Sequence, residues 1–95
     1  MSDSLKMYMT SVTSSRETKA HQAEMTRILD TCGQPYETVD ISVDSNLRAE
    51  MRDKAGNPSA LPPLLFRGNK LIGGIDELTS AVEDSKLEEL LQGKN

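Results

Sequence analysis

A short polar segment, Thr13-Ser14-Ser15-Arg16, stands where a catalytic loop would lie, directly ahead of a helical pattern. A helix start presents free backbone N–H groups and the positive end of the helix dipole, so it stabilises an anion or a thiolate. No cysteine occurs there, and an unassisted serine hydroxyl stays protonated at neutral pH. We interpret Ser14, with Glu17 three residues later, as a helix capping box. The alternative is a pocket that binds without reacting.

The chain holds one cysteine and one histidine, and neither is well placed for catalysis. Cys32 ends the helical apolar stripe of Met25, Ile28 and Leu29, where the negative end of the helix dipole disfavours a thiolate. We expect a half-buried packing residue, and a weak thiol oxidoreductase using Cys32 is the less favoured alternative. His21 lies in the middle of the helix and is interpreted as a surface residue. A single cysteine excludes an internal disulfide, and no metal site is expected.

A second candidate site is the segment Gly73-Gly74-Ile75-Asp76-Glu77. A glycine pair permits close backbone approach, and the N–H groups of a helix that starts there can hold a ligand carboxylate. The simpler interpretation is a strand end followed by a helix that Asp76 caps. We weigh the two interpretations equally.

A third candidate is the proline-containing segment Leu61-Pro62-Pro63, which precedes an apolar stretch. Its prolines suggest a ligand for SH3 or EVH1 domains. The spacing from Pro58 to the diproline misses P-x-x-P, and a segment embedded before a strand is hard to grip as polyproline II. Direct proline recognition is therefore the weaker hypothesis.

Period-two and helical patterns place these segments in the order β-α-β-α-β-β-α, followed by an extra helix. We predict strands at 5–10, 36–41, 64–66 and 70–72, and helices that begin at Ser14, at Asp44 or Ser45, at Asp76 and at the capping box Ser85 to Glu88. Gly33 ends the first helix, and the second ends near Gly56, Asn57 and Pro58. The order predicts an α/β fold with a four-stranded mixed sheet and helices on both faces, because the βαβ half needs a crossover and the hairpin half needs antiparallel pairing.

Length and charge limit the classes of function. The chain has 95 residues and a net charge of -4, which suits one domain, 1–95, with a modest core. The absence of a basic block argues against nucleic acid and anionic membranes as partners. We find no signal peptide and no apolar run long enough for a bilayer, and we expect a cytosolic monomer small enough to enter the nucleus.

The element order, the diproline and the segment LIGGIDEL together resemble a glutaredoxin within the thioredoxin-like fold. More closely, the segments LKMYMTSVTSSRETKAHQAEMTRILD, VDIS, LRAEMRDKAGNP and LPPLLF are similar to the SH3-domain-binding glutamic-acid-rich-like protein family, small glutaredoxin-shaped proteins without the redox cysteines. The resemblance covers nearly the whole chain. It implies a three-layer thioredoxin-like fold and a non-enzymatic adapter or modulator that binds protein partners.

The resemblance also assigns roles to particular positions. It places a cis peptide bond before Pro63, and in glutaredoxins the preceding residue pairs its backbone with glutathione. That residue is Pro62 here, which has no N–H, so one of the two backbone bonds is lost. Gly73 to Glu77 resembles the glutaredoxin G-G-x-D-D pattern, which holds the γ-glutamyl group. A module that binds glutathione or a related peptide is therefore the alternative function.

The leading hypothesis is a recognition surface built from three loops, 10–16, 61–63 and 73–77. It requires no catalytic residue and no cofactor. Its polar rim, represented by Thr13, Arg16 and Glu77, should lie outside the core and contribute little to folding.

Overall fold

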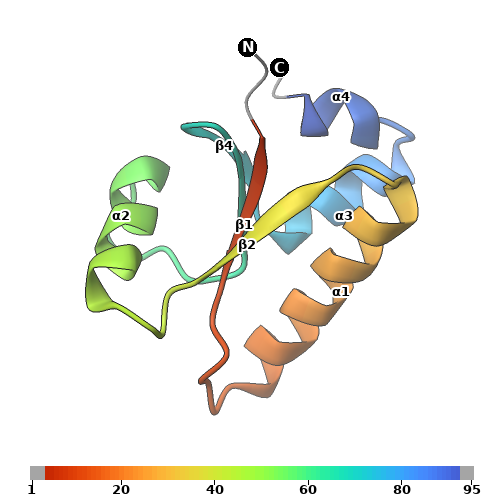
Figure 1. Cartoon of the computed structure of the whole chain (residues 1–95). Coiled ribbons are helices and arrows are strands. Elements are labelled where there is room, and N and C mark those ends of the chain that lie inside the picture. The colour runs from red at the N-terminus through yellow and green to blue at the C-terminus, as the bar shows by residue number, and fades with distance from the viewer. Residues whose placement is uncertain (1–3, 93–95) are drawn as a thin grey trace.

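A mixed four-stranded sheet lies between helices in the computed structural model, which describes residues 4–92 (Figure 1). The strands are β1 Leu5–Met9, β2 Tyr36–Asp40, β3 Leu64–Arg67 and β4 Lys70–Gly73. The helices are α1 Arg16–Cys32, α2 Ser45–Ala55, α3 Ile75–Glu83 and α4 Leu87–Leu91. In Figure 1, α2 covers one face of the sheet, and α1 and α3 cover the other. The predicted fold class is confirmed.

The strand pairing determines which loops share an end of the sheet. The order across the sheet is β2-β1-β3-β4, with β1 parallel to β2 and the other two pairs antiparallel. The carboxyl ends of β1 and β2 therefore lie at the same edge, where Met9 is opposite Asp40. Because β3 runs against β1 and β4 against β3, the start of β3 and the end of β4 lie at that edge as well. The segments 10–15, 41–44, 61–63 and 74–77 thus meet at one end of the molecule.

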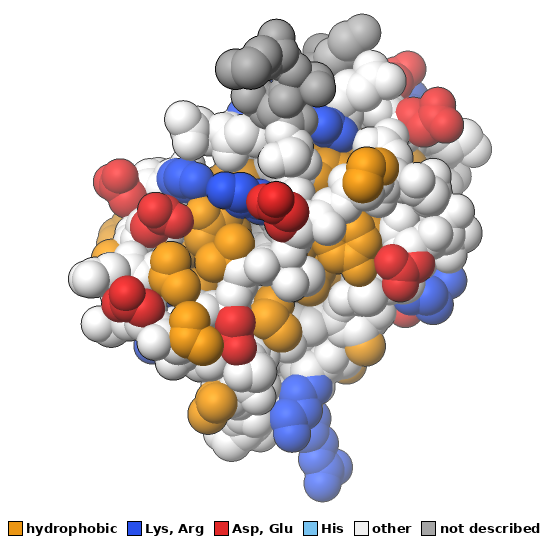
Figure 2. All heavy atoms as spheres, viewed as in Figure 1, with side chains coloured by type: hydrophobic (Ala, Val, Ile, Leu, Met, Phe, Trp, Pro, Cys, Tyr) orange, Lys and Arg blue, Asp and Glu red, His pale blue; other side chains and the backbone are white. Residues whose placement is uncertain are grey.

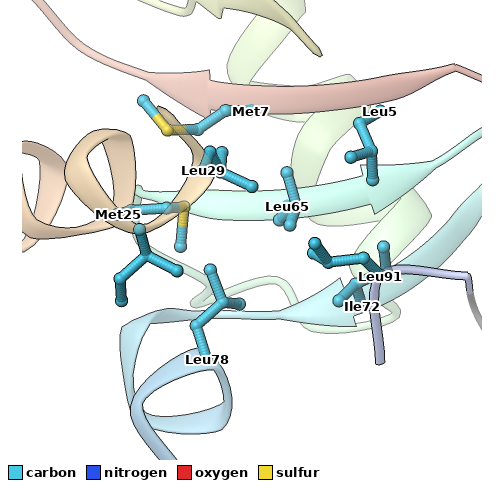
Figure 3. Packing of buried hydrophobic residues seen from close by; sticks show 9 residues of the cluster. Leu5, Met7, Met25, Leu29, Leu65, Ile72, Leu78 and Leu91 are labelled. Atoms are coloured by element: carbon cyan, nitrogen blue, oxygen red, sulfur yellow. The ribbon is translucent and has the colours of Figure 1, made fainter. Parts of the chain in front are cut away.

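The sheet is buried on both faces. Alternation along β1 turns Leu5 and Met7 toward α1 and α3, and it turns Tyr8 toward α2. In Figure 3, leucine and methionine side chains from α1, α3 and α4 converge on the residues of β1 and β3. The second core holds Tyr8 against Phe66 in an edge-to-face contact with ring centroids 5.2 Å apart. The first core holds α1 and α3 on the sheet, and both helices contribute to the site, whereas the second core holds α2.

Helix α1 follows the predicted apolar stripe but begins one residue later than predicted. Met25, Ile28 and Leu29 are buried, and the left-handed residue Gly33 ends the helix, as predicted. The N-cap is Ser15, whose hydroxyl accepts a hydrogen bond from the backbone N–H of Thr18 at 3.1 Å. The prediction that Ser14 caps this helix is therefore wrong.

The first residue of α1 depends on the geometry of the preceding loop. The hydroxyl of Thr13 accepts a hydrogen bond from the Ser15 N–H at 3.1 Å. That local turn leaves Ser15 in the extended conformation that an N-cap needs. Ser14 is exposed and lies inside the turn.

Two further predicted caps are wrong. Helix α3 begins after Gly74, so Asp76 lies in its first turn and does not cap it. Helix α4 begins after Lys86, and no side chain caps it, so the predicted box from Ser85 to Glu88 does not form. Ser85 has a φ of 58° and ends the connection from α3 instead. Of the two caps predicted for α2, Asp44 and Ser45, the structure has Asp44, whose carboxylate accepts from the N–H of residue 46 at 2.9 Å.

Across residues 4–92, no helix has both the length and the apolar character needed to cross a membrane.

Candidate functional site

A hollow of about 300 Å³ lies between the first turns of α1 and α3, above the segment that leads into β3. We call it the α1–α3 hollow. It is lined by Ser15, Glu17, Thr18, His21, Leu61, Pro62, Pro63, Leu64, Gly74, Ile75, Asp76 and Glu77. A wider hollow of about 530 Å³ runs along α2 and contains none of the predicted site residues. The fold thus brings together segments that lie about sixty residues apart in the sequence.

The predicted site residues divide into two groups. Seven of them line the α1–α3 hollow: Ser15, Leu61, Pro62, Pro63, Gly74, Asp76 and Glu77. Four do not line it: Thr13, Ser14, Arg16 and Gly73. Ser14 and Arg16 are exposed in the loop and the first turn, whereas Gly73 is buried at the end of β4. The lining therefore comes from the helix side of the first loop rather than from its tip.

At the start of α3, a backbone N–H is already bonded to a carboxylate of the same helix. The carboxylate of Glu77 turns back and accepts a hydrogen bond from the N–H of Gly74, with Oε1 and N 2.7 Å apart. This contact is one half of a capping box, and Gly74 has no side chain to supply the other half. A ligand carboxylate at this helix start would compete with Glu77 for the Gly74 N–H. Glu77 is therefore a capping residue, and its removal should cost the fold more than the removal of a rim residue that caps no helix, such as Arg16.

The diproline forms the floor of the hollow. The peptide bond between Pro62 and Pro63 is cis, as predicted, and Pro63 is buried. Pro62 has no N–H to offer, so the carbonyl oxygens are the only backbone hydrogen-bonding groups of this pair. Beside them, Leu61 leaves 68% of its surface exposed. The floor is thus apolar and nearly free of donors.

Sequence reasoning missed three lining residues of α1, Glu17, Thr18 and His21. The His21 imidazole lies 3.9 Å from the Glu17 carboxylate, measured from Nε2 to Oε1. A signal was available, because residues three apart along a helix share one side, and Ser15, Thr18 and His21 follow that spacing. His21 is more than the surface residue that the sequence suggested. No group of three or more His, Cys, Asp or Glu within residues 4–92 is arranged to hold a metal ion.

A side-chain amide holds the β1–α1 loop against α1. The Gln22 Oε1 accepts from the Thr10 N–H at 2.8 Å, and the Gln22 Nε2 donates to the Thr10 carbonyl at 3.0 Å. Thr10 is 5% exposed, so both of its backbone groups need internal partners. The clamp fixes the path from β1 to the first turn of α1 and hence the position of Ser15.

A carboxylate joins this loop to the next one. Asp40 Oδ1 accepts from the Ser11 N–H at 3.1 Å, the Ser42 N–H at 3.0 Å and the Ser42 hydroxyl at 2.6 Å. The Ser11 and Ser42 hydroxyl oxygens are themselves 3.1 Å apart. Hydrogen bonds from Ser11 and Ser42 hold the pKa of Asp40 well below its usual value, because they favour the charged form.

Acid should weaken this connection between the loops. A carboxyl group whose folded pKa is depressed stabilises the fold above its unfolded pKa of about 3.9 and loses that contribution as the pH falls. We therefore expect the melting temperature of the wild type to fall more steeply below about pH 4 than that of Asp40→Asn, whose amide does not titrate. Thermal melts of both proteins across acidic pH test this expectation. Parallel curves for the two proteins would contradict it.

Cys32 lies at the far end of α1 from the α1–α3 hollow. Sixteen residues of helix at 1.5 Å each separate it from Arg16 by about 24 Å. The thiol is half-buried against the core and donates to the Leu29 carbonyl at 3.1 Å. The predicted packing role is confirmed, and this thiol cannot act within the hollow.

Comparison with known proteins places the chain in a family. The sequence pattern of the family described as SH3-binding, glutamic acid-rich protein matches residues 3–94. The chain belongs to this family. An uncharacterized protein of Arabidopsis thaliana is 32% identical to the chain, over 92% of this chain and 22% of that protein. The chain thus spans about a fifth of the length of this curated relative.

Solved structures show the same fold. The actin interacting protein Aip5 of C. albicans has a TM-score of 0.78 at 21% identity, over 97% of this chain and 91% of that chain. A glutaredoxin from Brucella melitensis has a TM-score of 0.73 at 26% identity, over 99% of this chain and 95% of that chain. A buckwheat glutaredoxin in complex with glutathione has a TM-score of 0.69 at 21% identity, over 96% of this chain and 78% of that chain. This chain is therefore glutaredoxin-like in fold.

Proposed function

We propose that this chain is a non-catalytic, glutaredoxin-like adapter. It binds a protein partner at the end of the sheet where the α1–α3 hollow lies. The observation that carries the proposal is that the α1–α3 hollow, at the start of the helix that follows β1, has no cysteine in its lining. The donors at its two helix starts serve the chain itself, through Ser15 at α1 and Glu77 at α3. A hollow that keeps its shape without a reacting group is suited to recognition.

Exposed apolar side chains support a protein partner. Val12, Val43 and Leu61 lie on three loops at this end of the sheet, and each is at least two-thirds exposed. Figure 2 shows hydrophobic side chains at the surface toward the lower end of the view, where Figure 1 places the loop between β1 and α1. Burying them in an interface is favourable by about 25 cal/mol per Å² of apolar surface. The family name and the actin-interacting neighbour also support a protein as partner.

Leu61→Asp should abolish partner capture without unfolding the protein. The side chain lines the hollow and is 68% exposed, so the substitution places a charge in the interface and costs the fold little. Proteins retained from a cell lysate by wild type and variant would be compared by quantitative mass spectrometry. Val82→Asp, at an exposed valine of α3 outside the hollow, is the matched control and should retain the wild-type set. An unchanged set with a folded Leu61→Asp protein would place recognition elsewhere.

The protein should lack glutaredoxin activity. Its only thiol, Cys32, lies at the opposite end of α1 and is half-buried. A mixed-disulfide reduction assay with glutathione should show no turnover above the uncatalysed rate. Turnover that disappears in Cys32→Ser would overturn the non-catalytic assignment and favour a thiol oxidoreductase.

The other two candidates have weaker support. For glutathione, Pro62 has no N–H and Glu77 holds the Gly74 N–H, so two backbone contacts of the glutaredoxin type are already lost or occupied. For SH3 or EVH1 domains, Pro63 is buried and cannot enter an aromatic groove while the chain is folded. Residue-resolved NMR during a glutathione titration separates the glutathione binder from the adapter. We expect no shifts at Gly74 to Glu77.

A further inference from the structure

The α1–α3 hollow combines an apolar floor with a rim of one charge. The carboxylates of Glu17, Asp76 and Glu77 lie on its rim, whereas none of its lining residues is lysine or arginine. His21 is the one lining side chain that can become cationic, and it already faces Glu17 at 3.9 Å. Two helices far apart in sequence supply the carboxylates, so the tertiary structure brings them together.

Part of this negative charge is available to a ligand. Glu77 uses Oε1 to accept from Gly74, and its second oxygen has no hydrogen bond within residues 4–92. Over the same described part of the chain, the Asp76 carboxylate makes no hydrogen bond and no ion pair. Both carboxylates are exposed. Within the α1–α3 hollow they offer acceptors that no lysine or arginine of its lining engages.

The negative surface continues beyond the first hollow. A second hollow of about 490 Å³ begins at the same two carboxylates, Asp76 and Glu77, and runs along α3 to α4. Asp84 and Glu89 also line it, and Lys86 is its one cation. The two hollows share Asp76 and Glu77, so acidic side chains line both sides of the first turn of α3.

From this charge distribution we infer that the partner contributes an extended segment with a lysine or arginine in the α1–α3 hollow and an aliphatic neighbour over Leu61. The inference rests on the proposed function and specifies the ligand class. A basic side chain can place its apolar stem on the floor of Pro62 and Leu64 while its charged end reaches Asp76. A carboxylate-bearing ligand would meet three like charges.

The magnitude follows from the exposure of these groups. One exposed ion pair changes an affinity by about two- to fivefold, and several pairs in one groove add to the effect. Such pairs weaken with salt, because the Debye length is about 10 Å at 0.1 M and shorter at higher concentration. Binding of a basic segment should therefore be sensitive to salt and to each carboxylate.

Two synthetic peptides test the inference directly. One alternates leucine with lysine, and the other has glutamine in place of each lysine. Residue-resolved NMR of the full chain would follow the backbone amides of Ser15, Thr18 and Gly74 to Asp76 during each titration. We expect the lysine peptide to shift these amides, to bind at least about tenfold more tightly than the glutamine peptide, and to lose that advantage at high salt.

Two variants separate local contact from overall charge. Asp76→Asn should lower the affinity for the lysine peptide by about two- to fivefold and leave the affinity for the glutamine peptide unchanged. Glu83→Gln removes the same charge from the same helix, outside both hollows, and should leave both affinities near the wild type. Equal binding of the two peptides at the hollow would overturn the charge selection and leave the adapter function standing. An absence of shifts at these amides with the lysine peptide would also overturn the inference. The adapter function is tested separately, by the capture experiment with Leu61→Asp.

Discussion

Replacing Leu29 with alanine is expected to lower the free energy of unfolding by about 2–5 kcal/mol, the cost typical of a buried leucine truncated to alanine. Leu29 is fully buried in the core between the sheet and α1, where it packs with Met7, Met25 and Leu65 (Figure 3). The truncation removes apolar contacts and leaves a cavity that close-packed neighbours can fill only in part. Urea unfolding followed by circular dichroism measures the change.

Leu61→Ala is the matched control for this prediction, because the chemical change is identical and the site is 68% exposed. Its cost should stay below about 0.5 kcal/mol. Equal losses for the two variants would show that the core between the sheet and α1 is not packed as described.

Gly73→Ala is expected to destabilise the protein by about 2–4 kcal/mol and to displace the start of α3. Gly73 has a φ of 147°, a conformation that residues with a Cβ rarely adopt. A Cβ built there would lie 2.7 Å from the Cβ of Glu77. That atom is fixed to the α3 backbone, so the helix start itself must move. The Glu77 bond to Gly74 and the shape of the α1–α3 hollow should change with it.

Gly74→Ala is the neighbouring control. Its φ is -100°, and an added Cβ would come no closer than 3.6 Å to any atom, which is ordinary contact. Alanine is a poorer N-cap than glycine, so a loss of about 1 kcal/mol or less is expected. Thermal melts and amide shifts of residues 74 to 78 compare the two variants. If Gly73→Ala is as stable as Gly74→Ala and leaves those amides unshifted, the close approach of β4 to α3 is not as described.

The fold class, the main apolar faces and two of the helix ends were available from local pattern alone. The alternation from Leu5 to Met9 and the stripe ending at Cys32 each follow from the geometry of one element. Gly33 and Gly56 mark helix ends because a left-handed residue there favours glycine. The absence of a cysteine near Ser15 was equally visible in the sequence.

The starts of three helices were not predictable in the same way. Short polar runs offer several adjacent caps, and the choice depends on how the preceding loop is held. The Gln22 clamp on Thr10 and the turn at Thr13 move the cap of α1 to Ser15. At α3, the approach of Glu77 to Gly74 decides the boundary.

The character of the site was decided by tertiary structure. Glu17 lies on α1 and Asp76 and Glu77 on α3, and neither helix alone predicts that their carboxylates share a hollow. His21 joins them because the docking of α1 on the sheet turns that side of the helix toward the diproline. Sequence pattern reports the periodicity of one element at a time, whereas the charge of a site depends on which elements the two cores pack together.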